Sequence, residues 1–304
     1  MSGPEGNNKP VITSADLDHG VEMGKINDGY FSNPAMAQSF LEIAVAPLME
    51  DLGSAVEYAS FGGGEGYLPA LVVQAIRECG REVDGLVVDA NPDFLHLAQA
   101  RGLRTQCGDL EEVVLSGLDL ITMRSVNHYN APDAQRRILE RCLAALKPGG
   151  WCISQNLSGP SEAYCRLASD LSRIPELGRV DEQQDRPHIT SQAEFNGFME
   201  DVGFANVRVA GLAPDIIIGP AYYWARFNGK AHAEAVSRND AASLEALRER
   251  EQHYLRRANE LIDAFLVAAA PGEAGLIKQA GSSYSIPLHF PIHMGRCPAI
   301  GEGG

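Results

Sequence analysis

A glycine-rich stretch and an aspartate carry the chemistry that this sequence suggests first. Residues 59–68 read ASFGGGEGYL, where Gly62, Gly64 and Gly66 let the chain turn sharply and let a ligand approach the backbone without a side-chain clash. Asp89 closes the apolar run LVVDA, and a carboxylate in such a place can accept hydrogen bonds from both hydroxyls of a ribose. Together the loop and the acid indicate a cofactor that carries a nucleoside.

Each of these features also has a purely structural interpretation. Glycine-rich turns are common, and an aspartate just before Asn91-Pro92 can cap the helix that starts there. Asp109, in the stretch CGDLEEV, could pair with an adenine amino group or could cap another helix. The residues by themselves leave these alternatives open.

The elements that position these residues follow from an alternating pattern between residues 55 and 227. Short apolar runs predict strands, and helical spacing of apolar residues predicts helices of about 10–15 residues between them. This alternation predicts an α/β fold, with a mostly parallel sheet and helices on both of its faces. The glycine loop then follows the first strand, at the carboxyl edge of the sheet, where ligands bind in such folds.

The later part of the chain supports further expectations. We expect ANVRVAG (205–211) and IIIGPAYYWARF (216–227) to be strands with a short connection, so that one edge strand runs antiparallel. The tail SIPLHFPIHM (285–294) alternates strictly, and its two prolines favour an edge strand or an extended arm over a central strand. His289 and His293 would lie about 13 Å apart in an extended chain, too far to share a metal ion.

A narrow apolar stripe predicts one long helix of about 25 residues within 240–268. The stripe can pack on its own domain, form a dimer contact or act as a lid. The stripe consists of Leu244, Leu247, Tyr254, Ala258, Leu261 and Phe265.

These patterns divide the chain into three segments. They are an N-terminal segment and cap helix (1–53), an α/β domain (54–228), and a C-terminal helix with an extended arm (229–304).

Composition excludes some classes of partner. The formal net charge of -15 disfavours nucleic acid and anionic membrane surfaces, because such a protein repels phosphate groups. The six cysteines have no CxxC spacing, which indicates free thiols in a reducing compartment, not a disulfide framework or a zinc site. No stretch approaches the ~18 apolar residues that a membrane span needs. We expect a cytoplasmic protein without a metal.

With these features combined, the sequence resembles the class I S-adenosylmethionine-dependent methyltransferases. The resemblance covers about residues 55 to 227 and rests on ASFGGGEG, LVVDANP, CGDLEE, the long stretch from LDLITMRSVNHYN to AALKPGGWCIS, and ITSQAEFNGFMEDVGFANVRVAG. It implies a Rossmann-like fold with a mostly parallel, seven-stranded sheet. A nicotinamide-binding domain is less similar, since its loop reads GxGxxG and it lacks the KPGG turn.

The resemblance also implies positions for S-adenosylmethionine. Gly62, Gly64 and Gly66 would pass beside the methionine portion, and Asp89, followed by Ala90, would hold the ribose. Asp109 and Leu110 would flank the adenine, and Arg124 would face the cofactor and the substrate. The family usually has an acidic residue two positions before the first glycine, where this sequence has Ser60.

The substrate side is implied in the same way. The stretch MRSVNHYN resembles small-molecule O-methyltransferases, in which a histidine after the fourth strand deprotonates the acceptor hydroxyl. His128 takes that place, although Tyr129-Asn130 follow it where the family usually has Asp-Trp, so His128 is either that base or a residue of the pocket wall. We expect substrate contacts from Tyr30, Phe31, Asn127 and Tyr222.

The expected function is therefore methylation of a small organic molecule at oxygen, nitrogen or carbon, a reaction that would suit specialised metabolism. Two alternatives remain. One is an enzyme of the same fold that uses the bound cofactor for cyclisation, decarboxylation or rearrangement. The other is a non-catalytic partner subunit that binds the cofactor. Separately, the chain is a candidate homodimer.

Overall fold

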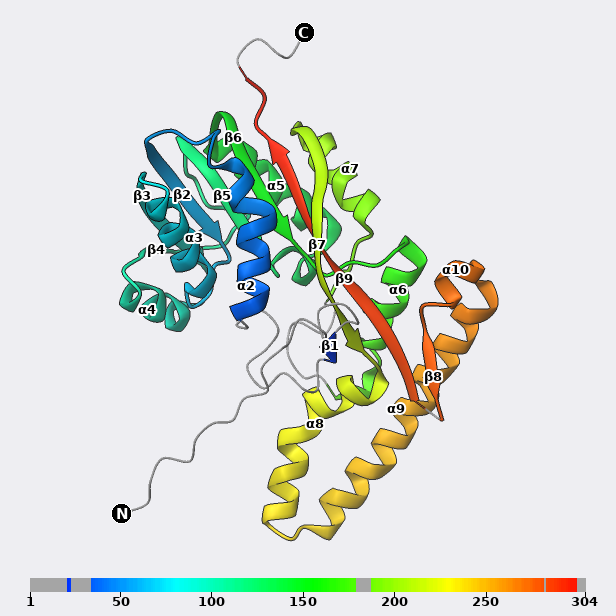
Figure 1. The fold of residues 1–304 in the computed structure, drawn as a ribbon. Coiled ribbons are helices and arrows are strands. Elements are labelled where there is room, and N and C mark those ends of the chain that lie inside the picture. Colours follow the sequence, from blue (N-terminus) through cyan, green and yellow to red (C-terminus); the bar gives the residue numbers. More distant parts are fainter. Residues whose placement is uncertain (1–20, 23–33, 179–186, 282, 300–304) are drawn as a thin grey trace.

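A nine-stranded sheet organises the computed structural model, which describes residues 21–22, 34–178, 187–281 and 283–299 (Figure 1). The strand order is β1-β7-β9-β6-β5-β2-β3-β4, and β8 pairs with β9 alone. Seven of these strands have four residues or more, which confirms the predicted α/β sheet. They are β2 (Ala55–Phe61), β3 (Glu82–Asp89), β4 (Arg104–Cys107), β5 (Leu118–Arg124), β6 (Leu146–Gln155), β7 (Ala205–Ile218) and β9 (Ser283–Arg296), and the short ones are β1 (Val21–Glu22) and β8 (Lys278–Ala280).

The strands β4, β3, β2, β5 and β6 are parallel, each to its neighbour. Parallel strands need a crossover connection, and helices provide it here. Their carboxyl ends therefore meet at one edge of the sheet, which carries the glycine loop after β2. The crossover helices are α3 (Tyr67–Glu78), α4 (Pro92–Ala100) and α5 (Pro132–Ala145).

Helices cover both faces of this sheet, as the alternation of strands and helices predicted. On one face, Tyr58 and Leu120 pack with residues of α3 and of α2 (Pro34–Phe40). On the other face, Ala59 and Ile121 pack with residues of α5 and of α7 (Gln192–Val202). Successive residues of a strand point to opposite faces, so each strand contributes to two apolar clusters.

The tail strand differs from its prediction as an edge strand or arm. β9 lies inside the sheet and runs antiparallel to both β6 and β7. Its prolines are tolerated because the ladder with β6 covers only residues 292–296, so Pro287 and Pro291 lie beyond it. Between the two prolines, His289 exchanges backbone hydrogen bonds with Ser158 as an isolated bridge. The missing N–H groups of the prolines therefore interrupt no regular ladder on this side of β9.

The segment IIIGPAYYWARF also differs from its prediction. Only Ile216, Ile217 and Ile218 are strand, as the end of β7, and Pro220 begins helix α8 (Pro220–Ser237). A proline fits the first position of a helix, where its missing N–H needs no partner. Tyrosine and tryptophan favour strands only when they pack on a sheet, and here they pack between helices. The expected boundary at residue 228 falls within α8.

The predicted long helix is α9 (Ala241–Ala268), which packs on its own chain. Tyr254, Ala258 and Ile262 are buried in a cluster with Trp224 of α8 and with residues of α6 (Glu162–Leu171). Leu261 is 37% exposed, beside the buried stripe. The remaining elements are α10 (Pro271–Ala274) and the short turns η3 (Leu41–Val45), η4 (Ala46–Leu48), η5 (Asn127–Tyr129) and η6 (Pro175–Leu177).

All six cysteines are free thiols in the structure. Among the described helices, none combines the length and apolar character that crossing a bilayer requires.

Candidate active site

The glycine loop joins β2 to α3 with three left-handed residues. The φ angles are 66° at Gly62, 53° at Gly64 and 76° at Gly66, a region that L side chains rarely adopt. A Cβ on Gly66 would lie 2.8 Å from Leu103 Cδ1, so this glycine is packed against protein. A Cβ on Gly64 would meet no atom closer than 4.0 Å. The middle of the loop therefore presents bare backbone to open space, which is what a ligand needs for close approach.

Asp89, at the end of β3, is tied to this loop. Its Oδ2 accepts a hydrogen bond from the Gly64 N–H at 2.9 Å, and its Oδ1 accepts one from the Asn91 N–H at 2.9 Å. Asn91 caps α4 with its own side chain, so Asp89 is not the helix cap. Each carboxylate oxygen retains acceptor capacity beyond its backbone bond. The structure thus places an oriented carboxylate next to the glycine loop.

The predicted adenine neighbours lie after β3 and β4. The Gly108 N–H donates to the backbone oxygen of Asp89 at 3.2 Å, which brings the two strand ends together. The exposed Asp109 accepts a hydrogen bond from the Glu111 N–H at 2.9 Å, so its carboxylate holds its own turn. Leu110 is partly buried, and Ala90 is exposed. Roles for these three residues in adenine binding stay predictions.

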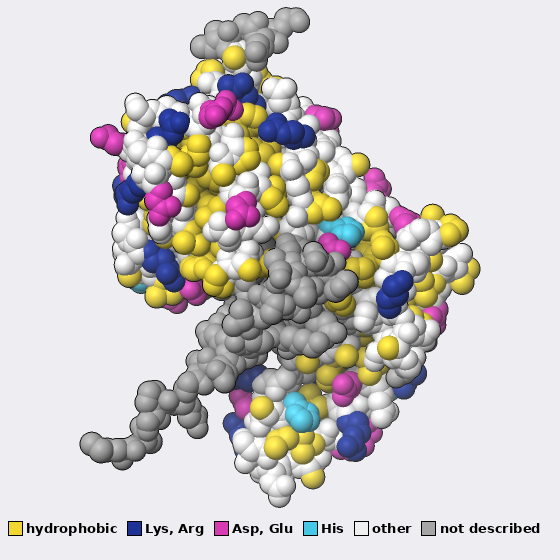
Figure 2. Space-filling view, viewed as in Figure 1, with side chains coloured by type: hydrophobic (Ala, Val, Ile, Leu, Met, Phe, Trp, Pro, Cys, Tyr) yellow, Lys and Arg dark blue, Asp and Glu magenta, His cyan; other side chains and the backbone are white. Residues whose placement is uncertain are grey.

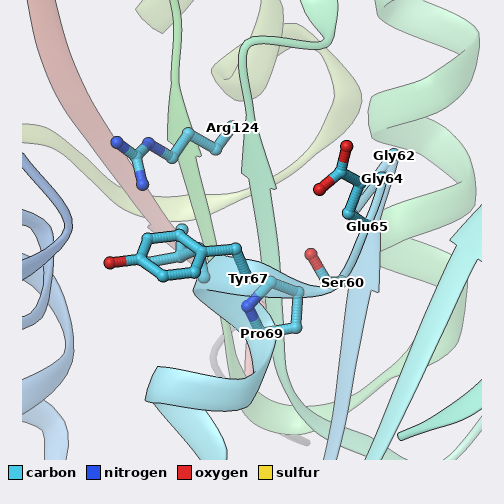
Figure 3. Close-up of a pocket in the computed structure, with 9 residues that line it drawn as sticks. Ser60, Gly62, Gly64, Glu65, Tyr67, Pro69 and Arg124 are labelled. Carbon is cyan, nitrogen blue, oxygen red and sulfur yellow. The ribbon is translucent and has the colours of Figure 1, made fainter. Parts of the chain in front are cut away.

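A cavity of about 230 Å³ opens beside the loop (Figure 3). Its lining combines the glycine loop, the first turn of α3 and the end of β5. Of the predicted cofactor residues, Ser60, Gly62, Gly64 and Arg124 line this cavity, and Gly66 does not. The complete lining is Ser60, Gly62, Gly63, Gly64, Glu65, Tyr67, Leu68, Pro69 and Arg124.

Ser60, in place of the acid usual in the resembled family, is the end of a buried hydroxyl chain. The Thr122 hydroxyl donates to Ser60 Oγ at 3.3 Å, and Thr122 Oγ1 lies 2.7 Å from Tyr58 Oη. Burial raises the pKa of Tyr58, so its phenol is neutral at physiological pH. Ser60 therefore presents a neutral, oriented hydroxyl to the cavity.

Arg124 supplies positive charge at the opposite wall. Its guanidinium carbon lies 5.9 Å from the centre of the Phe40 ring of α2. In Figure 3, Arg124 extends to the same side as Tyr67, which belongs to α3. A guanidinium is permanently charged and matches a carboxylate with two parallel hydrogen bonds. The cavity can thus accept a negatively charged group near Arg124.

His128 lies outside the lining of this cavity. It is buried, the Leu157 N–H donates to its Nδ1 at 3.5 Å, and its Nε2 lies 3.4 Å from Ser125 Oγ. Since Nδ1 accepts, the neutral ring carries its proton on Nε2. Burial, with a smaller effect from Arg226, lowers the pKa of His128 to about 3. The ring is therefore neutral and packed at physiological pH, and its role as a base stays a prediction.

Of the four predicted substrate residues, the structure describes Asn127 and Tyr222. Asn127 is completely buried and donates from Nδ2 to Ser154 Oγ at 3.0 Å. Tyr222 is a helical residue of α8, and its hydroxyl accepts a hydrogen bond from Arg226 Nη1 at 2.9 Å. Tyr30 and Phe31 lie outside the described residues. The structure does not bring Asn127 or Tyr222 to the cavity wall.

Two features of this edge escaped the sequence reasoning. Gln155, the last residue of β6, is a completely buried amide beside Arg124. His289 Nδ1 lies 2.6 Å from Asp215 Oδ1, in a pair just beyond the end of β6. The signal for Gln155 was present, since a polar residue ended an apolar strand, as Asp89 did. Nothing in the sequence places Asp215 beside His289, because the pairing of β7 with β9 is non-local.

Metal binding finds no support in the part of the chain that the structure describes, where no three His, Cys, Asp or Glu side chains are grouped to hold an ion. His289 and His293 contact different partners, Asp215 and Asn196.

Comparison with known proteins gives the family. A model of the O-methyltransferase domain matches residues 36–204, more than half of the chain. No curated protein sequence matches significantly. The YcgJ protein of Bacillus subtilis has a similar structure, with a TM-score of 0.57 and 16% identity over 87% of this chain and 98% of that one. A Bacillus halodurans protein described as a candidate methyltransferase has a TM-score of 0.58 and 16% identity, over 86% and 99% of the two chains.

The two structural similarities support the fold, and the family match supports the activity. The chain belongs to the O-methyltransferase domain family and is an enzyme that methylates a small molecule with S-adenosylmethionine as its cofactor.

Proposed function

We propose that the chain transfers the methyl group of S-adenosylmethionine to a hydroxyl oxygen of a small organic molecule. The observation that carries the proposal is the cavity that joins the open backbone of Gly64 to the charge of Arg124. The family match to an O-methyltransferase domain favours oxygen over nitrogen or carbon as the acceptor atom.

The residues present fit the cofactor. The space above Gly64, which a Cβ would enter without meeting protein, suits a ligand that lies against the loop. Arg124 would take the carboxylate at the amino-acid end, Ser60 would accept from its ammonium group, and Asp89 would hold the ribose hydroxyls. Ala90, Asp109 and Leu110 would flank the adenine. When bound, the cofactor supplies an electrophilic methyl group on a sulfonium.

The remaining work of the chain is to hold the acceptor oxygen in line with the methyl group and to exclude water. Alignment of this kind can lower a barrier by roughly 7–11 kcal/mol, which is more than a single base contributes. Asn127, Tyr222, Tyr30 and Phe31 are our candidates for contacts with the acceptor.

Proton removal is needed only for an acceptor that arrives protonated. His128 is our first candidate for the base, since the ring is in its neutral form, but a base with such a low pKa accepts a proton weakly. His289 is the second imidazole of this edge, and Asp215 orients it through Nδ1. An acidic hydroxyl, such as that of a phenol with electron-withdrawing groups, is the acceptor that a weak base suits best.

Calorimetry tests the cofactor assignment without knowledge of the acceptor. S-adenosylmethionine and S-adenosylhomocysteine should bind, and NAD should not. Asp89→Ala should lower the affinity about 10- to 100-fold, because charge-assisted hydrogen bonds contribute ~1.5–3 kcal/mol. Asp93→Ala, which removes an exposed carboxylate on the neighbouring helix, is the matched control and should bind normally. Equal affinity of the wild type and Asp89→Ala for S-adenosylhomocysteine would remove Asp89 from the site.

We extend the proposal to the setting of the enzyme. The net charge of -15, with acidic and basic side chains interspersed over the face in Figure 2, favours a cytoplasmic enzyme that does not bind nucleic acid. The helices α8 and α9 extend from the sheet as an antiparallel pair (Figure 1), and their outer faces are our candidate for a homodimer contact. Sedimentation of the wild type and of a Val236→Glu variant would test that contact.

A further inference from the structure

Gln155 occupies a defined position next to the cofactor cavity. It is the register partner of Arg124 on β5, and Ile292 of β9 is its partner on the other side. Residues paired in register on neighbouring strands share a face of the sheet. That face is the one covered by α2, because Arg124 lies over the ring of Phe40. Gln155 and Arg124 are therefore neighbours on the cavity side of the sheet.

The amide of Gln155 is buried without hydrogen bonds. Its side chain is 0% exposed, and neither Oε1 nor Nε2 has a hydrogen-bond partner. An amide has two donors and two acceptor sites, and leaving them unmet in the interior destabilises the fold. On the opposite face of the sheet, the amide groups of Asn127 and Asn156 both donate to Ser154 Oγ. Gln155 differs from them, because neither its amide oxygen nor its amide nitrogen has a hydrogen-bond partner.

The residues near the ends of the neighbouring strands indicate which kind of ligand this part of the site, with the amide of Gln155, would serve. Arg124 of β5 and Gln155 of β6 end two adjacent strands, and Ser60 is the next-to-last residue of β2, the strand beside β5 at the carboxyl edge of the sheet. They provide one cation and two neutral hydrogen-bonding groups, a set that suits a zwitterion with its carboxylate at the cation. The amino-acid end of S-adenosylmethionine is such a group. Glu65, the acid among the cavity-lining residues, is exposed on the loop.

We propose that Gln155 is a positioning residue for the amino-acid end of the cofactor, acting through Arg124. The inference rests on the proposed function. When the cofactor carboxylate engages the guanidinium, Gln155 Oε1 accepts an N–H of Arg124 and holds the planar group in the orientation that the carboxylate requires. Gln155 acts indirectly, through Arg124, because it does not line the cavity itself. No bond is made or broken in this step.

A comparison of two ligands tests the inference. S-adenosylhomocysteine carries the amino-acid end, and 5′-methylthioadenosine shares the adenosine and the sulfur but lacks that end. We expect Gln155→Leu to weaken S-adenosylhomocysteine about tenfold in calorimetry and to leave 5′-methylthioadenosine unchanged, with a melting temperature equal to or above that of the wild type. Gln155→Met replaces Gln155→Leu if the branched side chain prevents folding.

Two further variants separate positioning from general packing. Arg124→Met should show the same selectivity for the ligand pair, and adding Gln155→Leu to it should weaken S-adenosylhomocysteine little further, because the two residues act as a unit. Gln135→Leu is the matched control, since Gln135 is also a buried glutamine with an unpartnered Oε1, on α5. It should leave the ratio of the two affinities unchanged.

The outcomes are distinct. Equal weakening of both ligands by Gln155→Leu, or no effect on either, overturns the role of Gln155 while cofactor binding by the wild type still supports the proposed function. A wild type that binds neither ligand overturns the proposed function, and the inference about Gln155 falls with it.

Discussion

His128 and His293 are two imidazoles that the fold buries away from water. Burial lowers the pKa of each to about 3. His293 is held by Asn196, whose Oδ1 lies 2.7 Å from Nδ1. Both rings are thus neutral hydrogen-bonding groups at physiological pH. At acidic pH, protonation of these histidines favours the unfolded chain.

Stability should therefore fall as the pH drops below about 6.5. The unfolded chain binds a proton at each histidine near its ordinary pKa, while the folded chain does so only near 3, so protons favour unfolding between these values. Linkage gives about 2 kcal/mol lost per histidine from pH 7 to pH 5. Urea unfolding across this range measures the slope.

Single substitutions assign that slope to its residues. His128→Gln and His293→Gln should each flatten the dependence of the unfolding free energy on pH by about one proton. His232→Gln, at an exposed position on α8, should leave it unchanged. A histidine ring signal of His128 that titrates between pH 6 and 7 by NMR would contradict the argument.

At the residue scale, the sequence singles out candidate site residues by their type and by their position relative to the apolar runs and motifs. Asp89 was singled out because it closes an apolar run, and Ser60 because it stands where the resembled family usually has an acid. The structure places Asp89 at the end of β3 and Ser60 in the cavity lining, and their roles toward the cofactor stay predictions. The environment of His128 was not predictable, because its burial depends on Leu157 and on the segment around His188, whose N–H donates to the backbone oxygen of His128. Such contacts come from distant parts of the chain.

At the scale of the element, the glycine loop combines two kinds of glycine. Gly66 is required by packing, because a Cβ there would lie 2.9 Å from Ala98 Cβ as well as close to Leu103. Gly64 has open space where a Cβ would stand, and we proposed above that the cofactor lies there. Both have left-handed backbones, so both share the cost of that conformation for an alanine, ~1–2 kcal/mol.

Alanine at the two positions should therefore separate stability from binding. Gly66→Ala should destabilise the protein by about 1–3 kcal/mol more than Gly64→Ala, because it adds overpacking to the backbone cost. Gly64→Ala should weaken S-adenosylhomocysteine at least about tenfold, or ~1.4 kcal/mol, since its methyl group enters the ligand space. Chemical denaturation and calorimetry measure the two effects. A larger stability loss for Gly64→Ala would contradict the division of roles.

Element types were predictable where local patterns agreed with the final packing. The alternating segments from β2 to α5 were found, because helices and strands there follow their own periodicity. The segment from Pro220 was taken for a strand, since its aromatic residues favour strands until helices α6 and α9 enclose them. The place of β9 was also missed, because proline rules assume a full ladder on both sides and the sequence does not show where β6 ends.

At the scale of the whole molecule, β9 connects the apolar clusters. Leu288 belongs to the cluster of α6, α8 and α9, whereas Ile292 belongs to the cluster under α2 and α3. Both side chains are completely buried. One strand therefore links the apolar cluster of the C-terminal helices to the cluster under α2 and α3, and the division at residue 228 does not separate two independent cores.

We predict that the protein unfolds in a single cooperative transition. Leu288→Ala and Ile292→Ala should each lower its free energy of unfolding by about 2–5 kcal/mol and shift the whole transition. Val267→Ala, at a side chain that is 90% exposed, should change it by less than about 0.5 kcal/mol. Scanning calorimetry and helix and aromatic circular dichroism should report the same midpoint. Two separated transitions in either variant would show independent units.

The position of β9 between β6 and β7 has a consequence for biosynthesis. Both neighbours leave the ribosome before β9 does, and α8, α9, α10 and β8 are made in between. At about 5–20 residues per second, that interval lasts several seconds, during which β6 and β7 each have a strand edge whose backbone groups await β9. A chaperone that shields unpaired strands would act on these edges, and a translational pause after β7 would prolong the exposure.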